Sequence, residues 1–131
     1  EYIYHRNIIL KQKYENGIKV GKIIMKEYFK NKKIFKGESL NGKRNGEGEE
    51  YFKNKLIFKG TFLNGKRNGY GIEYNLNGEK FVGEFKNGKK WDGIGYKKNN
   101  TIDYDITNGY GIVKEYFNGT FSFYVSLQNI F

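Results

Sequence analysis

The 131-residue sequence contains no cysteine, no proline and no alanine, and it has a single histidine. The lack of cysteine excludes a disulfide framework, a thiolate zinc site and a cysteine nucleophile. No apolar run approaches the roughly 20 residues that a membrane-spanning helix needs. The first residues also lack the charged, apolar and small-residue pattern of a signal peptide. These absences exclude several kinds of site and leave the fold open.

Aromatic and basic residues, by contrast, are abundant. The sequence has 12 Tyr, 11 Phe and 1 Trp, whereas disordered chains are poor in these residues. Lysine and arginine number 24 against 14 acidic residues, which gives a formal net charge of +10. The composition therefore predicts a soluble, basic, β-rich protein with the length of about one domain.

The middle of the sequence repeats with a period of 23 residues. Three motifs return at this offset: Glu-Tyr-Phe-Lys-Asn-Lys, an aromatic residue followed by x-Gly, and Asn-Gly-Lys. They occupy residues 27–32 and 50–55, then 35–37, 58–60 and 81–83, and finally 41–43, 64–66 and 87–89. A fixed period of this length is typical of an array in which one supersecondary unit is stacked on the next.

Each repeat unit carries the signals of a β-hairpin. Residues 58–63 alternate in the manner of a strand, and residues 69–74 alternate again. The Asn-Gly dipeptide at 64–65 lies between them and is a strong turn signal, because both residues tolerate positive φ. The sequence therefore predicts an all-β fold without helices. We expect an elongated single-layer antiparallel meander of stacked β-hairpins, with about five units of about 23 residues.

Glycines recur at two positions of the unit. One set comprises Gly37, Gly60 and Gly83, and the other comprises Gly48, Gly71 and Gly95. Glycine weakens a strand unless its missing side chain leaves room for a neighbour. Because an aromatic residue is always near these glycines, we expect cross-strand aromatic rings to cover them and to form most of the core.

The repeats define a single domain over residues 1–131. Regular repeats occupy about 27–96, with a divergent N-terminal unit at about 8–26 and a divergent C-terminal unit and cap at about 97–131. The last strand, 120–127, has an apolar face and no glycine, so it is either a cap or an edge for a homodimer. The apolar run 8–10 has the same two interpretations. The apolar face of 120–127 is formed by Phe121, Phe123, Val125 and Leu127.

These residues resemble the MORN (membrane occupation and recognition nexus) repeat, whose pattern is roughly Tyr/Phe-x-Gly-x-Phe/Trp followed by spaced glycines. The residues that fit are Phe58, Gly60, Phe62, Gly65, Gly69 and Gly71 in one unit, and Phe81, Gly83, Phe85 and Gly88 in the next. The resemblance covers about residues 13–119. It implies stacked hairpins that act as protein-binding scaffolds and dimerisation modules, with phospholipid contacts proposed for members at membranes. MORN repeats are not catalysts in themselves.

The sequence offers too few of the residues that an enzyme active site needs. The only histidine, His5, precedes the regular repeats and is expected to be solvated. A lone histidine without cysteine makes neither a usual triad nor a zinc site. Asp103 and Asp105 would share a strand face about 7 Å apart, but no base or oxyanion donor accompanies them. We therefore expect no catalytic residue, no metal and no cofactor.

Basic residues follow the same turn in three consecutive units, so the array would set them in a row about 10 Å apart. Such a ladder would attract an anionic membrane. The alternative is that these residues are solvated hairpin tips that prevent edge pairing. The candidates are Lys43, Arg44, Lys66, Arg67, Lys89 and Lys90.

Aromatic residues suggest a second kind of surface, a face that binds a segment of a partner protein. The candidates are Phe58, Phe62, Tyr70, Tyr74, Phe81, Phe85 and Trp91. Nucleic acid is not expected as a partner, because these rings recur beside glycines where the core already needs them. The sequence therefore predicts a non-enzymatic scaffold with protein partners, and the alternative is a peripheral adaptor on anionic phospholipid. Without an organelle signal we expect a cytoplasmic location, at a membrane or cytoskeletal structure in the alternative.

Overall fold

The computed structural model describes the backbone of residues 6–117 and 120–126, and the side chains of residues 6–111. His5 and Leu127 lie outside this part, as do the side chains of Phe121, Phe123 and Val125. The predictions made for these five residues therefore lie outside the described part of the chain.

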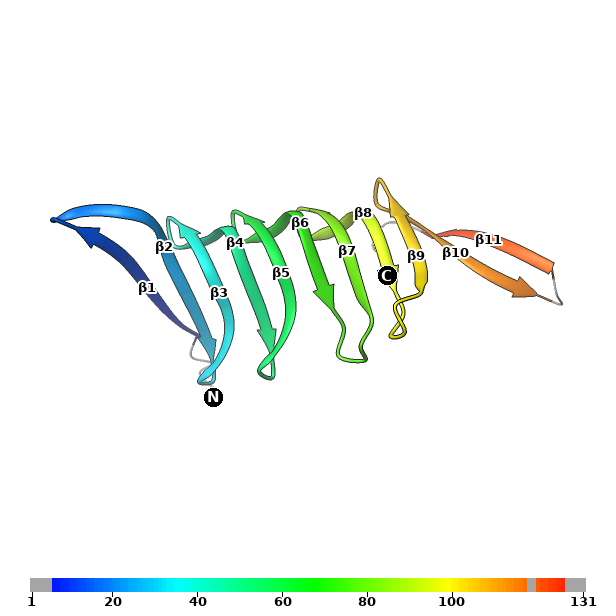
Figure 1. The fold of residues 1–131 in the computed structure, drawn as a ribbon, viewed down its shortest axis with the longest axis horizontal. Helices are drawn as coiled ribbons and strands as arrows, with labels where there is room; N and C mark the ends of the chain where they lie inside the picture. The colour runs from blue at the N-terminus through cyan, green and yellow to red at the C-terminus, as the bar shows by residue number, and fades with distance from the viewer. Residues whose placement is uncertain (1–5, 118–119, 127–131) are drawn as a thin grey trace, which may run out of the picture. The chain divides into compact units, whose positions relative to one another are not determined.

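The described chain is all-β, as predicted, and contains no helix (Figure 1). It divides into two compact units, residues 1–66 and 67–131. In both units every strand is antiparallel to the next strand along the chain, so the predicted meander of hairpins is confirmed. The strands are β1 (Arg6–Glu15), β2 (Ile18–Phe29), β3 (Lys32–Leu40), β4 (Lys43–Phe52), β5 (Lys55–Leu63), β6 (Lys66–Tyr74), β7 (Lys80–Lys86), β8 (Lys89–Tyr96), β9 (Ile102–Thr107), β10 (Tyr110–Phe117) and β11 (Thr120–Ser126).

The turns explain why the strands form hairpins. At five Asn-Gly turns both central residues have positive φ, for example 50° at Asn64 and 88° at Gly65, whereas at Asn77-Gly78 only the glycine does. These values belong to the two-residue turn whose twist matches that of antiparallel strands. The turns of this kind are at 16–17, 41–42, 64–65, 87–88 and 108–109.

The Asn-Gly turns at 64–65, 87–88 and 108–109 are also hydrogen-bonded to the preceding repeat. In unit 1 the Gly65 N–H donates to the Arg44 carbonyl at 2.9 Å, and the Asn64 N–H donates to Asn45 Oδ1 at 3.3 Å. The same bonds recur in unit 2, where they join residues 87–88 to residues 67–68. Successive hairpins are therefore joined at their turns as well as along their strands.

The core lies on one side of the sheet, which we call the Phe face. In unit 1 this face carries Phe35, Phe58 and Phe62, whose exposed fractions are 0, 0 and 4%. Their rings meet edge to face, with centroids 5.1 Å apart for Phe35 and Phe62 and 5.4 Å apart for Phe58 and Phe62. Such pairs stabilise a core beyond the area that they bury.

Glycine makes room for these rings. Gly48 lies directly opposite both Gly37 and Gly60, and a Cβ added to it would lie 2.6 Å from the Phe35 ring. The two glycine sets of the sequence are therefore one row across the strands of unit 1. In unit 2 the row is formed by Gly71, Gly83 and Gly93. Gly95, which the sequence placed in the row, instead lies opposite Phe81 on β7 and Tyr104 on β9.

In unit 2 the Phe face carries Phe81 and Phe85, which are 1 and 2% exposed and meet edge to face at 5.5 Å. Tyr104 stacks on Phe81, with centroids 6.2 Å apart and an interplanar angle of 8°. Ile106 completes this core at 1% exposure. Both units thus use cross-strand aromatic rings over a glycine row, as the sequence predicts.

Candidate functional site

In each of the three basic pairs that follow the Asn-Gly turns, the two side chains have different surroundings. Adjacent residues of a strand point to opposite faces. The first member of each pair, namely Lys43, Lys66 and Lys89, is exposed. The second member, namely Arg44, Arg67 and Lys90, lies over a ring of the Phe face of its own unit.

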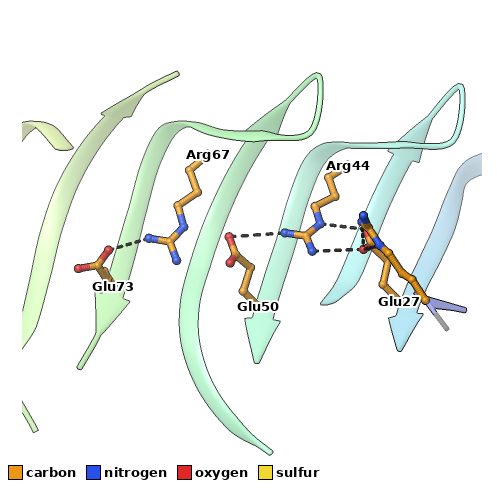
Figure 2. Close-up of polar contacts among 6 residues, drawn as sticks. Glu27, Arg44, Glu50, Arg67 and Glu73 are labelled. Atoms are coloured by element: carbon orange, nitrogen blue, oxygen red, sulfur yellow. Dashed lines mark hydrogen bonds and ion pairs between the residues drawn. The ribbon is translucent and has the colours of Figure 1, made fainter. Parts of the chain in front are cut away.

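Arg44 is bound between two glutamates on the Phe face of unit 1 (Figure 2). Its Nε donates to Glu27 Oε1 at 2.9 Å, and its Nη1 lies 3.7 Å from Glu50 Oε1. Arg6 of β1 donates to the same Glu27 carboxylate from the other side. The Arg44 side chain is 17% exposed and Glu27 only 1%, so their ion pair is internal, whereas Arg6 is 55% exposed.

The two arginines decide the charge state of Glu27. Burial by itself raises the pKa of this carboxyl, but the hydrogen bonds from Arg44 and Arg6 outweigh burial and hold the pKa below its ordinary value of 4.5. Glu27 is therefore charged at neutral pH. A buried carboxylate of this kind depends on its partners, because its desolvation is compensated only while both arginines are in place.

Aromatic rings hold the Arg44 guanidinium as well. Its carbon lies 4.4 Å from the Phe35 centroid and 5.8 Å from the Phe62 centroid. Cations over ring faces are attracted by the ring quadrupole, more strongly where water is excluded. Arg44 thus belongs to the core of unit 1.

Unit 2 repeats this arrangement with a lysine. Arg67 Nη1 lies 2.6 Å from Glu73 Oε2, and Lys90 Nζ lies 3.2 Å from Glu73 Oε1. Lys90 also donates to the Tyr104 hydroxyl at 2.9 Å and lies over the Phe81 ring at 5.2 Å. At 7% exposure Lys90 is among the most buried charged residues of the described chain.

The sequence interpretation missed the acidic partners of these cations. Glu27, Glu50 and Glu73 recur with the same 23-residue period as Arg44, Arg67 and Lys90. Glu27 and Glu50 even belong to the repeated motif at 27–32 and 50–55. An acidic and a basic series with one period was the available signal, because matching periods place the two series beside each other in every unit.

The aromatic candidates do not share one face. Phe58, Phe62, Phe81 and Phe85 are the buried residues of the two Phe faces. Tyr70 lies opposite Glu84 and Tyr74 opposite Lys80, which places both tyrosines on the other side of unit 2. Tyr70 is 74% exposed and Tyr74 is half-buried. Trp91 is also half-buried, with Lys86 Nζ 4.5 Å from its ring.

The second row of turns in unit 1 combines exposed rings with lysines. Phe29 and Phe52, at 37 and 47% exposure, precede the turns Lys30-Asn31 and Lys53-Asn54. The lysine of each turn lies over the ring of the preceding Phe, at 5.5 and 5.4 Å. These turns, like the Asn-Gly turns, are candidates for contact with an anionic partner.

Charge is divided unequally between the two units. Residues 1–66 contain 16 Lys and Arg and 7 Glu, which is a formal net charge of +9. Residues 67–131 contain 8 Lys and Arg and 7 Asp and Glu, a net charge of +1. Attraction of an anionic partner would therefore act mainly through unit 1.

The described residues offer few groups for chemistry. Asp103 and Asp105 both lie on β9, and both are exposed. No group of three or more His, Asp or Glu side chains in the described part could hold a metal ion. Within the same residues, no helix has the length and apolarity to cross a membrane.

Comparison with known proteins matches the repeat found in the sequence. The model of the MORN repeat family matches residues 35–56, 58–79 and 81–91. A search of curated proteins finds no match. The matched segments coincide with the regular repeats, in which the aromatic residue, the glycine row and the Asn-Gly turn recur together.

Proposed function

Because residues 35–91 of this chain are three consecutive MORN repeats, which in general are modules of interaction scaffolds, we propose that the chain is a non-enzymatic scaffold that binds a protein partner. One observation carries this proposal. The phenylalanines of the Phe faces are buried, whereas Tyr70 is 74% exposed on the opposite side of the sheet of unit 2. Large exposed aromatic residues are typical anchors of protein interfaces.

Capture of partner proteins tests this proposal. The immobilised chain should retain specific proteins at about 0.15 M salt, because a contact made by apolar and aromatic groups is little screened. Tyr70→Ala should abolish this retention, and Trp91→Ala should weaken it. Tyr14→Ala is the matched control, since Tyr14 is 56% exposed in β1 of the other unit. Retention that is the same in all four proteins would contradict the proposal.

A second candidate function is that of a peripheral adaptor on anionic phospholipid. It is supported by the exposed turn lysines Lys43, Lys66 and Lys89 and by the charge of +9 on residues 1–66. Lysines close to an anionic membrane surface contribute about 1 kcal/mol each to binding, and salt weakens that attraction. Arg44, Arg67 and Lys90 have no part in this candidate, because internal glutamates pair with them.

Liposome co-sedimentation tests the second candidate, with neutral and phosphoinositide-containing vesicles compared at low salt and at about 0.15 M. Reversal of Lys43, Lys66 and Lys89 to Glu should abolish sedimentation with anionic vesicles. The control reverses Lys32, Lys53 and Lys55, which lie at the opposite row of turns and change the net charge equally. If only the control variant loses co-sedimentation, the membrane contact lies at the turns that follow Phe29 and Phe52. That result would contradict a membrane contact through the lysines of the Asn-Gly turns.

Self-association and location complete the proposal. The C-terminal strand β11 pairs with β10 and is the candidate edge for a homodimer. Sedimentation velocity over a range of concentrations tests this, and a monomer at all of them would contradict it.

We propose a cytoplasmic location, peripheral to a membrane if the adaptor function holds, and fluorescence microscopy of the tagged chain tests it.

A further inference from the structure

The outer edge of β1 is a second feature that invites a partner. β1 pairs regularly with β2 through residues 6–11, and the register then shifts between Lys11 and Lys13, where Gln12 faces residues 21–23 of β2. No other strand of the described chain pairs with the opposite edge of β1. Along an antiparallel edge, alternate residues direct their N–H and C=O groups away from the sheet. The six residues 6–11 span about 20 Å, and three of them present these groups to the outer edge.

Apolar side chains flank this edge on both faces. Ile8, Ile9 and Leu10 are 46, 55 and 50% exposed. Ile8 and Leu10 lie opposite Glu27 and Met25 on the Phe face, and Ile9 lies on the other face. Edge strands are commonly protected by lysine, proline or bulges within the paired stretch. Here the centre of the stretch has none of them.

The positive charge on and around residues 6–11 determines which kind of strand fits this edge. Arg6 and Lys11 bound the apolar centre, and Lys26 lies opposite Ile9 on β2. A second copy bound at this edge would bring a second unit 1, and so a second net charge of +9, to the interface. Two units of like charge repel each other, whereas carboxylates opposite Arg6 and Lys11 would stabilise a strand pair. An acidic strand therefore fits this edge better than a second copy does.

We infer that the edge of β1 binds an extended segment of a partner protein, apolar at its centre and acidic at its ends, which adds a strand to the sheet of unit 1. The backbone groups of residues 6–11 supply the hydrogen bonds, and the alternate side chains supply the specificity. The inference rests on the proposed scaffold function and names the chemistry of one partner segment and the place where it binds.

The probe is a fluorescein-labelled peptide of about eight residues, with isoleucines at the centre and glutamates at both ends. The control peptide replaces the glutamates with lysines. Fluorescence anisotropy with the full chain at about 0.15 M salt should show binding of the acidic peptide alone. Amide hydrogen exchange should slow at alternate residues of 6–11, because an added strand bonds to every second residue.

Two variants locate the contact. Ile9→Lys places a cation at the apolar centre and should weaken the acidic peptide about tenfold or more. Ile18→Lys is the matched control, because Ile18 is 69% exposed at the start of β2, opposite Glu15 and outside residues 6–11, and should leave binding unchanged. Lys11→Glu reverses an end charge, so the acidic peptide should weaken and the basic peptide should gain. Thermal unfolding followed by circular dichroism verifies that each variant is folded.

Three results would overturn the inference. They are absence of acidic-peptide binding, binding that Ile9→Lys and Ile18→Lys affect equally, and protection of residues 6–11 by dimerisation without peptide, which would make a second copy the occupant. Protein capture that depends on Tyr70 would persist in any of these cases if the scaffold function is correct. Failure of the edge and failure of the scaffold can therefore be told apart.

Discussion

Lys43 and Arg44 are neighbours in the sequence with the same charge, yet the structure gives them different surroundings. Lys43 is exposed, whereas Arg44 is held by two glutamates and lies between two phenylalanine rings. The difference follows from the alternation of side chains along β4. A residue-level account of binding must therefore separate the cations that stabilise the fold from those that can meet a partner.

Glu27 should make the stability of unit 1 depend on pH. Because its pKa in the folded chain lies below 4.5, its stabilising effect is complete above that pH and is lost as the pH falls through the lowered pKa. The unfolding free energy, measured by urea titration from pH 7 downwards, should fall below about pH 4.5.

Glu27→Gln tests the origin of this pH dependence. The variant should be less stable at pH 7 by about 3 kcal/mol, because it leaves two arginines without their shared carboxylate, and its acid-induced loss should be smaller. The control is Glu15→Gln, since Glu15 pairs with Lys13 on the surface and should matter by less than about 1 kcal/mol. An unchanged acid limb in Glu27→Gln would contradict the role given to Glu27.

Gly48→Ala should destabilise the chain although alanine usually suits a strand better than glycine does. The added Cβ would lie 2.6 Å from the ring of the fully buried Phe35. Overpacking of this kind costs about 1–3 kcal/mol, measurable as a shift in the urea midpoint. Gly65→Asn is the control, because nothing lies within 4 Å of that position and asparagine tolerates its φ of +88°. Equal effects of the two changes would refute the packing explanation.

At the scale of the element, the hairpins are connected by more than strand pairing. The turn at 87–88 donates its Gly88 N–H to the Arg67 carbonyl at 2.7 Å and its Asn87 N–H to Asn68 Oδ1 at 3.1 Å. The Asn of the repeated Lys-Arg-Asn-Gly segment thus binds the following turn. This contact gives a structural reason for a polar residue at this position of the repeat.

Asn68→Ala should accelerate hydrogen exchange at the Asn87 amide, which loses its acceptor, and should cost about 1 kcal/mol of stability. Asn99→Ala is the control. Asn99 accepts from the Thr101 N–H within its own loop, so the change should accelerate exchange there and leave Asn87 as it was. Exchange at Asn87 that is unaffected by Asn68→Ala would contradict the turn-to-turn connection.

Much of this element structure is predictable from the sequence, and the limits have a physical cause. Asn-Gly dipeptides and alternating residues predict the hairpins, because both signals are local. Alternation even predicts that Lys43 and Arg44 point to opposite sides. The partners of Arg44 depend on the register between β2, β3 and β4, including the shift between Gly37 and Ser39, and no local signal carries that register. The row formed by Gly37, Gly48 and Gly60 was missed for the same reason.

At the scale of the whole molecule, the unequal charge of the two units is the main feature. A net charge of +9 on residues 1–66 attracts anions and also destabilises that unit through self-repulsion. Residues 67–131, at +1, have little such repulsion. The proposed acidic segment on β1 and the proposed anionic surface at the lysine turns both draw on this difference.

Salt should therefore protect the two units differently. Between low salt and about 0.5 M salt, screening should relieve repulsion in residues 6–66 and slow their amide exchange, while residues 67–111 should change less. The ion pairs of Glu27 and Glu73 are buried enough to be screened little. Exchange that slows equally in both units would contradict this account of the charge.

The central claim is that each basic pair divides into a structural cation and an exposed one, and the direct test compares Lys43→Met with Arg44→Met. Both changes remove one positive charge from adjacent residues of β4. Urea unfolding at pH 7 should show a loss of about 3 kcal/mol for Arg44→Met, which leaves buried carboxylates poorly paired, and a change within about 0.5 kcal/mol for Lys43→Met. Equal losses in the two variants would contradict the division and return Arg44 to the candidates for binding.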